Sequence, residues 1–143
     1  MKIKVISFGF KYKHLPEASI LFDLRFLDNP YWQPEMRTMT GLDEKVSDFI
    51  MSVPGASEFY DNYKRTIEQV LPLAQKKESK GGDIQSEIVI AFGCTGGQHR
   101  SVAFAERLGK DLKKDGYKVT ISHRDLQKSL KKELAKVKEE AKP

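Results

Sequence analysis

The sequence predicts a single α/β domain, built as a small layered sandwich with a mostly parallel sheet and helices packed on it. Short apolar stretches typical of strands alternate along the chain with longer stretches that have helical periodicity. A length of 143 residues with 39% hydrophobic residues suits one domain that buries its own core. Neither an internal repeat nor a shift in composition marks a second domain, so we expect one domain over residues 1–143.

Four strands are expected, each marked by apolar residues in a strand-like pattern. The first alternates apolar and polar residues, and the third is an apolar run typical of a buried strand. The helical stretches that separate the later strands favour parallel strands joined by helices. The expected ranges are Lys2–Phe8, Ser19–Arg25, Ser86–Phe92 and Tyr117–His123.

Two helices are expected between the second and third strands. Pro72 is expected to kink or end the later one, because proline lacks the amide that continues the helical hydrogen bonds. A polar turn from Lys76 to Asp83 follows. The inward-facing residues recur at helical spacing: Leu42, Val46, Phe49 and Ile50 in the first helix, and Phe59, Tyr63, Ile67, Val70 and Leu71 in the second.

Two more helices are expected in the C-terminal part of the chain. One begins at Ser101 and ends at Lys114-Asp115-Gly116, with Val102, Ala105, Leu108 and Leu112 on its apolar face. The other is a basic helix at about residues 124–141, with lysines around a face of Leu126, Leu130, Leu134 and Val137. Two interpretations stay open for this helix: its leucines dock it on the domain, or it meets RNA phosphates or another subunit.

Charge and cysteine content narrow the function classes. A net charge of +5 permits contact with nucleic acid or phosphorylated ligands without requiring either. The single cysteine excludes an internal disulfide and a cysteine-rich zinc site, and the three histidines show no metal-ligand spacing. No apolar run approaches the roughly 20 residues of a membrane span, and the N-terminus is typical of a strand and not of a signal peptide. We therefore expect a cytoplasmic protein.

The segment Cys-Thr-Gly-Gly-Gln-His-Arg-Ser, residues 94–101, joins the third strand to the third helix. Glycines let such a turn present successive backbone amides, and a helix N-terminus carries roughly half a positive charge. The guanidinium of Arg100 can hold two phosphate oxygens at once, and Ser101 is expected to cap the helix. We predict a phosphate site here, with loop amides supplied by Thr95, Gly96, Gly97, Gln98 and His99.

The long connection from Phe26 to Gly41 is the second candidate segment. Its two prolines oppose regular structure, and ordered loops of this length tend to be functional. Ligands of open parallel sheets bind beyond the carboxyl ends of the strands, so this connection and the glycine-rich loop are expected to face one crevice. The residues expected to select the organic part of the ligand are Tyr31, Arg25, Asn29 and Arg37.

The glycine-rich segment also fits C-x5-R, the spacing of cysteine-dependent phosphatases. In those enzymes a thiolate attacks phosphorus while the arginine and the loop amides hold the oxygens. Gly93 stands where they usually have histidine, and no general acid stands out beyond Asp28. Phosphatase activity is therefore kept as the alternative. The simplest alternative to any binding or catalytic site is that the glycines form a tight turn and Cys94 is a small buried apolar residue.

With these residues in view, the chain resembles the C-terminal domain family of the bacterial RNase adapter protein RapZ over nearly its whole length. The resemblance implies a small α/β domain related to part of a sugar-phosphate kinase fold. It further implies that the domain senses a phosphorylated amino sugar and binds RNA, without catalysis. The segments that carry it are Ser7–Lys11, Asp23–Trp32, Thr40–Asp43, Gly93–Val102 and His123-Arg124.

The resemblance also assigns site residues. Its ligand pocket corresponds to Thr95, Gly96, His99 and Arg100, with Tyr31 where the family often has histidine. No G-x-x-x-x-G-K-[ST] loop of the nucleotide-binding domain that accompanies the family is present in this sequence. The basic cluster of the family is interrupted here by Ser129 and Leu130, so the RNA-binding residues expected are Arg124, Lys128, Lys131 and Lys132.

Together these observations predict a non-enzymatic sensor or adapter domain with no catalytic residues. Its expected partners are an amino-sugar phosphate bound in the glycine-rich loop and RNA on the basic face. No cofactor, metal or membrane partner is expected, and the formation of a homo-oligomer stays open.

Overall fold

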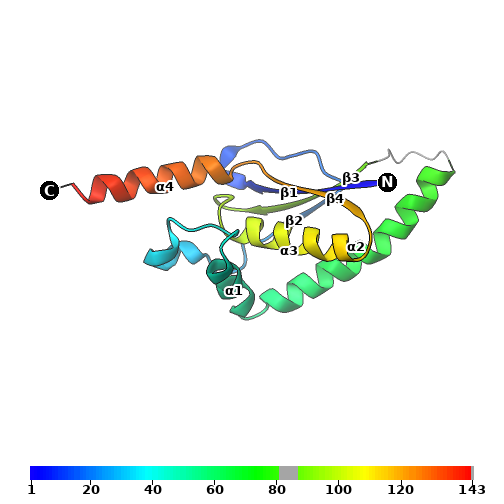
Figure 1. Cartoon of the computed structure of the whole chain (residues 1–143), viewed down its shortest axis with the longest axis horizontal. Coiled ribbons are helices and arrows are strands. Elements are labelled where there is room, and N and C mark those ends of the chain that lie inside the picture. Colours follow the sequence, from blue (N-terminus) through cyan, green and yellow to red (C-terminus); the bar gives the residue numbers. More distant parts are fainter. Residues whose placement is uncertain (81–86, 143) are drawn as a thin grey trace.

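The computed structural model describes residues 1–80 and 87–142 and contains a four-stranded sheet in which every pairing is parallel (Figure 1). The strand order is β2-β3-β1-β4. The bounds are Lys2–Gly9 for β1, Ile20–Asp23 for β2, Glu87–Cys94 for β3 and Lys118–His123 for β4. The predicted α/β class is therefore confirmed. Ser86, the first residue predicted for the third strand, lies outside the described residues.

Helices follow the strands largely as the periodicity predicts. Three short 3₁₀ turns, η1 (Phe10–Tyr12), η2 (Pro30–Trp32) and η3 (Pro34–Met36), lie in the connections that flank β2. The α-helices are α1 (Glu44–Ser52), α2 (Ala56–Ser79), α3 (Arg100–Lys114) and α4 (Leu126–Glu140). No helix within residues 1–80 and 87–142 is long and apolar enough to cross a membrane.

The core lies between the sheet and the three helices α1, α2 and α3, which share one side of it (Figure 1). Alternate residues of β1 and β3 face this side, as expected for strands with one helix-covered face. The inward residues of the strands meet apolar faces at helical spacing. Fully buried members are Ile3, Val5, Ile90, Phe92, Ile50, Ile67, Leu71, Phe104, Leu108 and Leu112. Leu42, predicted to face inward, is instead 54% exposed because it precedes α1.

Helix α2 bears on two predictions about the chain around Pro72: of the predicted kink or end at this proline the end is wrong, and so is the first part of the predicted polar turn. The helix does not end at Pro72 but continues to Ser79, so the first part of the predicted polar turn is helical. Pro72 is exposed while Leu71 is buried, so the missing amide hydrogen bond lies toward solvent, where water can satisfy the carbonyl. The rest of the predicted turn, residues 81–83, lies outside the described residues.

Helix α4 starts beside the sheet and extends past its carboxyl edge (Figure 1). Its N-cap residue, Asp125, is fully buried and accepts a hydrogen bond from the amide of Gly9 at 2.7 Å. Leu126 is buried, but Leu134 and Val137 are 51% and 44% exposed. Docking through the whole leucine face is therefore not observed, and α4 is held mainly at its first turns.

Candidate functional site

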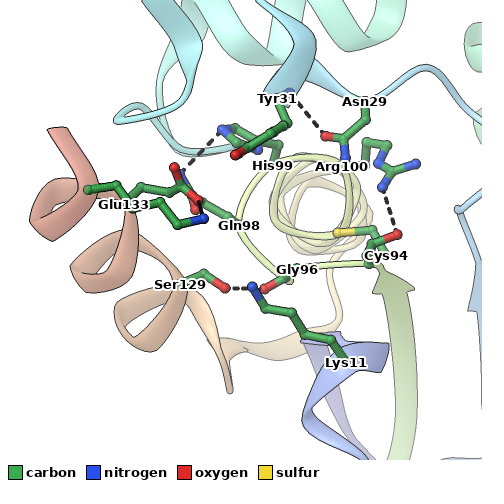
Figure 2. Close-up of a pocket in the computed structure, with 12 residues that line it drawn as sticks. Lys11, Asn29, Tyr31, Cys94, Gly96, Gln98, His99, Arg100, Ser129 and Glu133 are labelled. Carbon is green, nitrogen blue, oxygen red and sulfur yellow. Dashed lines mark hydrogen bonds and ion pairs between the residues drawn. The ribbon is translucent and has the colours of Figure 1, made fainter. Parts of the chain in front are cut away.

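A cavity of about 210 Å³ opens at the carboxyl edge of the sheet, between the loop after β3, the η2 turn and α4 (Figure 2). The glycine-rich loop and the long connection do face one cavity, as the sequence predicts. Of the predicted ligand residues, those that line the cavity are Asn29, Tyr31, Thr95, Gly96, Gln98, His99 and Arg100. The others, Arg25, Arg37, Gly97 and Ser101, lie outside its lining.

Two walls enclose much of the cavity. The loop wall is the segment Thr95–Arg100 that connects β3 to α3. The helix wall consists of Ser129, Glu133 and Lys136 on α4. Lys11 reaches the cavity between them, from the turn that follows β1 (Figure 2).

Close backbone packing shapes the loop wall. A Cβ on Gly9 would lie 2.6 Å from the carbonyl carbon of Gly96, so the end of β1 can approach the loop only as glycine. Gly97 has a φ of 72°, a conformation that side chains other than glycine rarely adopt. A Cβ on Gly96, in contrast, would meet nothing closer than 3.7 Å. The loop therefore has room for a guest on the side of Gly96.

The amides of the loop wall are free of protein acceptors. Within residues 1–80 and 87–142, no group accepts a hydrogen bond from the backbone amides of residues 95–100. Helix α3, which begins at Arg100, adds the partial positive charge of its N-terminus to the same place. Unpaired amides at a helix start form an anion-binding arrangement.

Gln98 and His99 hold the long connection against the loop wall. The Gln98 side-chain amide donates to the carbonyls of Arg37 and Met39, at 2.7 and 2.8 Å. His99 Nε2 lies 2.7 Å from the Met36 carbonyl oxygen, to which it donates. Burial lowers the pKa of His99, so the imidazole is neutral near pH 7. These polar side chains therefore stabilise the fold and also line the cavity.

Arg100 is 3% exposed and is turned toward the chain segment that follows β2. Its Nη1 donates to the Leu27 carbonyl at 2.8 Å and to the Arg25 carbonyl at 3.3 Å, and Nη2 reaches Thr95 Oγ1 at 3.4 Å. Its buried Nε has no acceptor among residues 1–80 and 87–142. The bidentate grip on phosphate stays a prediction, whereas the structural tie from α3 to the 24–27 segment is observed.

The η2 turn places Asn29 and Tyr31 at the cavity. Asn29 Oδ1 accepts a hydrogen bond from the Tyr31 amide at 3.1 Å, which fixes the turn (Figure 2). Arg37 supports Tyr31 from behind, since Nε donates to the Tyr31 carbonyl at 3.0 Å and the guanidinium lies over the ring. Arg25 instead pairs with Asp23 at 2.6 Å and stacks on Phe10.

Cys94 lines the cavity with 2% of its surface exposed. Its thiol donates to Ser101 Oγ at 3.1 Å, and Ser101 N lies 3.4 Å from the same sulfur. The predicted capping role of Ser101 is therefore wrong: Ser101 is fully buried inside α3, and the N-cap residue is His99, with no side-chain cap.

The helix wall is the part of the site that sequence reasoning missed. Ser129, Glu133 and Lys136 recur at i, i+4 and i+7, so they share one face of α4. Ser129 Oγ donates to the Gly96 carbonyl and lies 2.9 Å from Tyr12 Oη. This polar repeat was the signal in the sequence that could have indicated the helix wall. The stronger leucine pattern of α4 obscured it.

The residues predicted to bind RNA lie on and before α4. Arg124 and Lys128 both pair with Asp125, each with a nitrogen 2.9 Å from a carboxylate oxygen. Lys128 and Lys132 also lie over the ring of Tyr12, at 4.5 and 4.9 Å from its centroid. Lys131 is exposed. Together they form a basic surface around one aromatic ring.

Within residues 1–80 and 87–142, no group of three or more histidine, cysteine or acidic side chains is placed so that it could hold a metal ion.

Comparison with known families gives one clear match. The family model of the RapZ C-terminal domain covers residues 1–127. It includes the loop wall and the η2 turn and ends before the helix wall.

Proposed function

The chain belongs to the RapZ C-terminal domain family, and from this membership we propose that it is a sensor or adapter domain that binds an amino-sugar phosphate in the cavity of the glycine-rich loop. The family supports an adapter or sensor role. The proposed ligand class rests on the chemistry of the residues that line the cavity.

The observation that carries the proposal is the row of unpaired amides in the loop wall, set beside cationic side chains. Lys11, Lys136 and Arg100 all line the cavity. Lys11 Nζ lies 3.9 Å from the place where a Cβ on Gly96 would be, so its ammonium is next to the loop. Amides and ammonium groups around one small space are suited to a phosphate dianion.

Each part of the cavity has a role in this proposal. The loop amides and Lys11 bind the phosphate. Arg100 acts mainly as a positioning residue, because it holds the 24–27 segment and Thr95 together. Tyr31 and Asn29 face the organic part of the ligand from the η2 turn.

A thermal-shift panel of sugar phosphates, amino-sugar phosphates and nucleotides tests this function. A ligand at 100 times its Kd stabilises the folded state by about 2.7 kcal/mol, which raises the Tm by about 5 °C or more. Lys11→Met should weaken phosphate ligands about 10-fold. Lys13→Met, two residues away and outside the cavity lining, is the matched control. If no phosphorylated compound shifts the Tm, the proposal fails.

RNA binding is the second function that an observation favours. Tyr12 is surrounded by the ammonium groups of Lys11, Lys128 and Lys132, and an aromatic ring among cations suits an unpaired base and its phosphates. Replacing Lys128, Lys131 and Lys132 by glutamine should lower the slope of log affinity against log salt by about 2. The same change at Lys110, Lys113 and Lys114 of α3 is the charge-matched control. Equal effects of the two triple variants on a single-stranded RNA would contradict a site at Tyr12.

The phosphatase alternative rests on Cys94, whose sulfur lines the cavity beside the start of α3. It requires turnover of an aryl phosphate that Cys94→Ser abolishes. The binding function requires instead that Cys94→Ser leaves ligand affinity within about 3-fold, since no step uses the thiol. One activity assay and one titration on the same variant separate the two.

A further inference from the structure

The geometry points to Glu133 as the residue that makes the cavity select ligands with an ammonium group over ligands with a hydroxyl group at the same place. This inference rests on the proposed function, since it concerns the organic part of a phosphorylated ligand. It assigns a specificity role to a side chain of α4, outside the residues that the family model covers.

Glu133 is a buried acid in a cationic cavity. The residue is 7% exposed, and of the described residues that line the cavity it alone is acidic. Burying a carboxylate is costly unless it is paired and hydrogen-bonded. Within the described part of the chain its ion pair is with Lys136, whose Nζ lies 3.3 Å from Glu133 Oε1, a long contact to a flexible side chain on the same helix. The carboxylate therefore keeps acceptor capacity for a cation in the cavity.

The position of Glu133 is fixed by its neighbours on α4. One turn earlier, Ser129 is bonded to the Gly96 carbonyl and to Tyr12. One turn later, Lys136 Nζ lies 5.9 Å from the centre of the Tyr31 ring. Glu133 thus stands between the loop wall and the η2 turn, and the contacts of Ser129 hold this part of α4 beside the loop.

The charges of the cavity are separated in space. Lys11 reaches in beside Gly96, whereas Glu133 enters from α4 toward Gln98 and Tyr31 (Figure 2). A phosphate beside Lys11 and the loop amides leaves the sugar ring to extend toward Glu133. A hydroxyl there can donate one neutral hydrogen bond, whereas an ammonium adds an ion pair in a largely buried place.

Binding of the amine also changes the partner of Lys136. In the free protein Lys136 neutralises Glu133 across the contact of 3.3 Å. A ligand ammonium takes over that role, which leaves the Lys136 ammonium free to move toward the ring of Tyr31. The helix wall therefore fits a ligand with charges of both signs and not a simple anion.

Calorimetric titration with two ligands that differ at one substituent tests the inference. The probes are glucosamine 6-phosphate and glucose 6-phosphate, titrated into the wild-type chain, Glu133→Gln and Glu139→Gln. Glu139 lies on the same helix, is 74% exposed and pairs only with Lys142 among the described residues, so its variant is the matched control. The wild-type chain should bind the amine about 10-fold more tightly, which corresponds to one charge-assisted hydrogen bond.

In Glu133→Gln the affinity for the amine should fall about 10-fold while the affinity for the hydroxyl ligand changes less than about 3-fold. Glu139→Gln should keep the wild-type preference. Equal binding of both probes by the wild-type chain, or an unchanged preference in Glu133→Gln, overturns the role of Glu133 and leaves phosphate binding standing. Binding of neither probe overturns the proposed function and this inference with it. The ratio of the two wild-type affinities needs no variant. Equal affinities therefore overturn the inference even if Glu133→Gln fails to fold.

Discussion

The two walls of the cavity are built in opposite ways. The loop wall is backbone held by buried contacts, among them Gly9 against Gly96 and Arg100 on the 24–27 carbonyls. The helix wall is a set of side chains on a helix whose outer apolar residues, Leu134 and Val137, are exposed. Changes in the loop wall should therefore cost stability, whereas changes in the helix wall should alter which ligand is bound. Substitutions in the two walls test this difference.

Gly9→Ala should lower the free energy of unfolding by about 3 kcal/mol, because the added Cβ meets the backbone of Gly96 and cannot be accommodated by rotating a side chain. Urea unfolding measures this loss. Gly96→Ala is the control, since its Cβ would make only ordinary contacts and should cost less than about 1 kcal/mol. Similar losses in both variants would show that the close approach of β1 is not what holds the loop.

Arg100→Met should lower the free energy of unfolding by about 2 kcal/mol, because it removes the charged donor of the buried carbonyls of Leu24 and Leu27. Methionine keeps the apolar part of the side chain, so the loss reports the hydrogen bonds. A variant as stable as the wild-type chain, in the same urea titration, would mean that the guanidinium is free to serve a ligand.

Stability should also depend on pH through His99. Burial lowers the pKa of His99 in the folded state, and the nearby Arg100 lowers it further, against opposing effects of the Met36 carbonyl and Glu133. The unfolded chain then takes up the proton first, so stability is complete above about pH 6.5 and declines as the pH falls below it. Each unit of pKa difference between the two states contributes about 1.4 kcal/mol.

The check is urea unfolding of His99→Gln at several values between pH 7.5 and pH 5. His99→Gln should show a shallower decline than the wild-type chain. The remaining decline belongs to His123, whose pKa burial also lowers. His14→Gln, at an exposed position, should keep the wild-type decline. Identical curves for His99→Gln and His14→Gln would contradict the assignment.

Lys136→Met should lower the free energy of unfolding by about 1 kcal/mol, less than Arg100→Met, because the exposed Lys136 ammonium is the partner of the largely buried Glu133 carboxylate. Its larger effect should appear in ligand binding. Differential scanning fluorimetry without and with a sugar phosphate separates the two quantities. A loss of stability as large as that of Arg100→Met would end the distinction between the two walls.

The sequence predicted the loop wall better than the helix wall for a physical reason. The glycine pair between an apolar strand and an amphipathic helix has few structural solutions, so its place at the sheet edge could be inferred. On α4 the leucines at helical spacing predicted the buried face, yet Ser129 and Glu133 are buried while Leu134 is exposed. The periodicity of apolar residues shows which face of a helix could be buried. It does not show which part of the fold that helix contacts.

The directions of the Arg100 and Ser101 side chains also could not be predicted from the sequence. Arg100 was expected to point at a phosphate because it follows the glycines, but the carbonyls of the 24–27 segment were not foreseeable from spacing. Ser101 was expected to cap α3, but the helix begins one residue earlier and the hydroxyl instead meets Cys94. Both depend on contacts between segments far apart in the chain.

Helix α4 is attached to the rest of the domain mainly at its first turns. Asp125 ties its start to the amide of Gly9, and beyond Lys136 the helix runs on to Glu140 with Val137 open to solvent. At about 1.5 Å per residue, Glu133 stands about 10 Å from Leu126 and Glu140 about 21 Å. The last turn of α4, beyond Lys136, therefore adds to neither wall of the cavity. Its residues can change without altering the site.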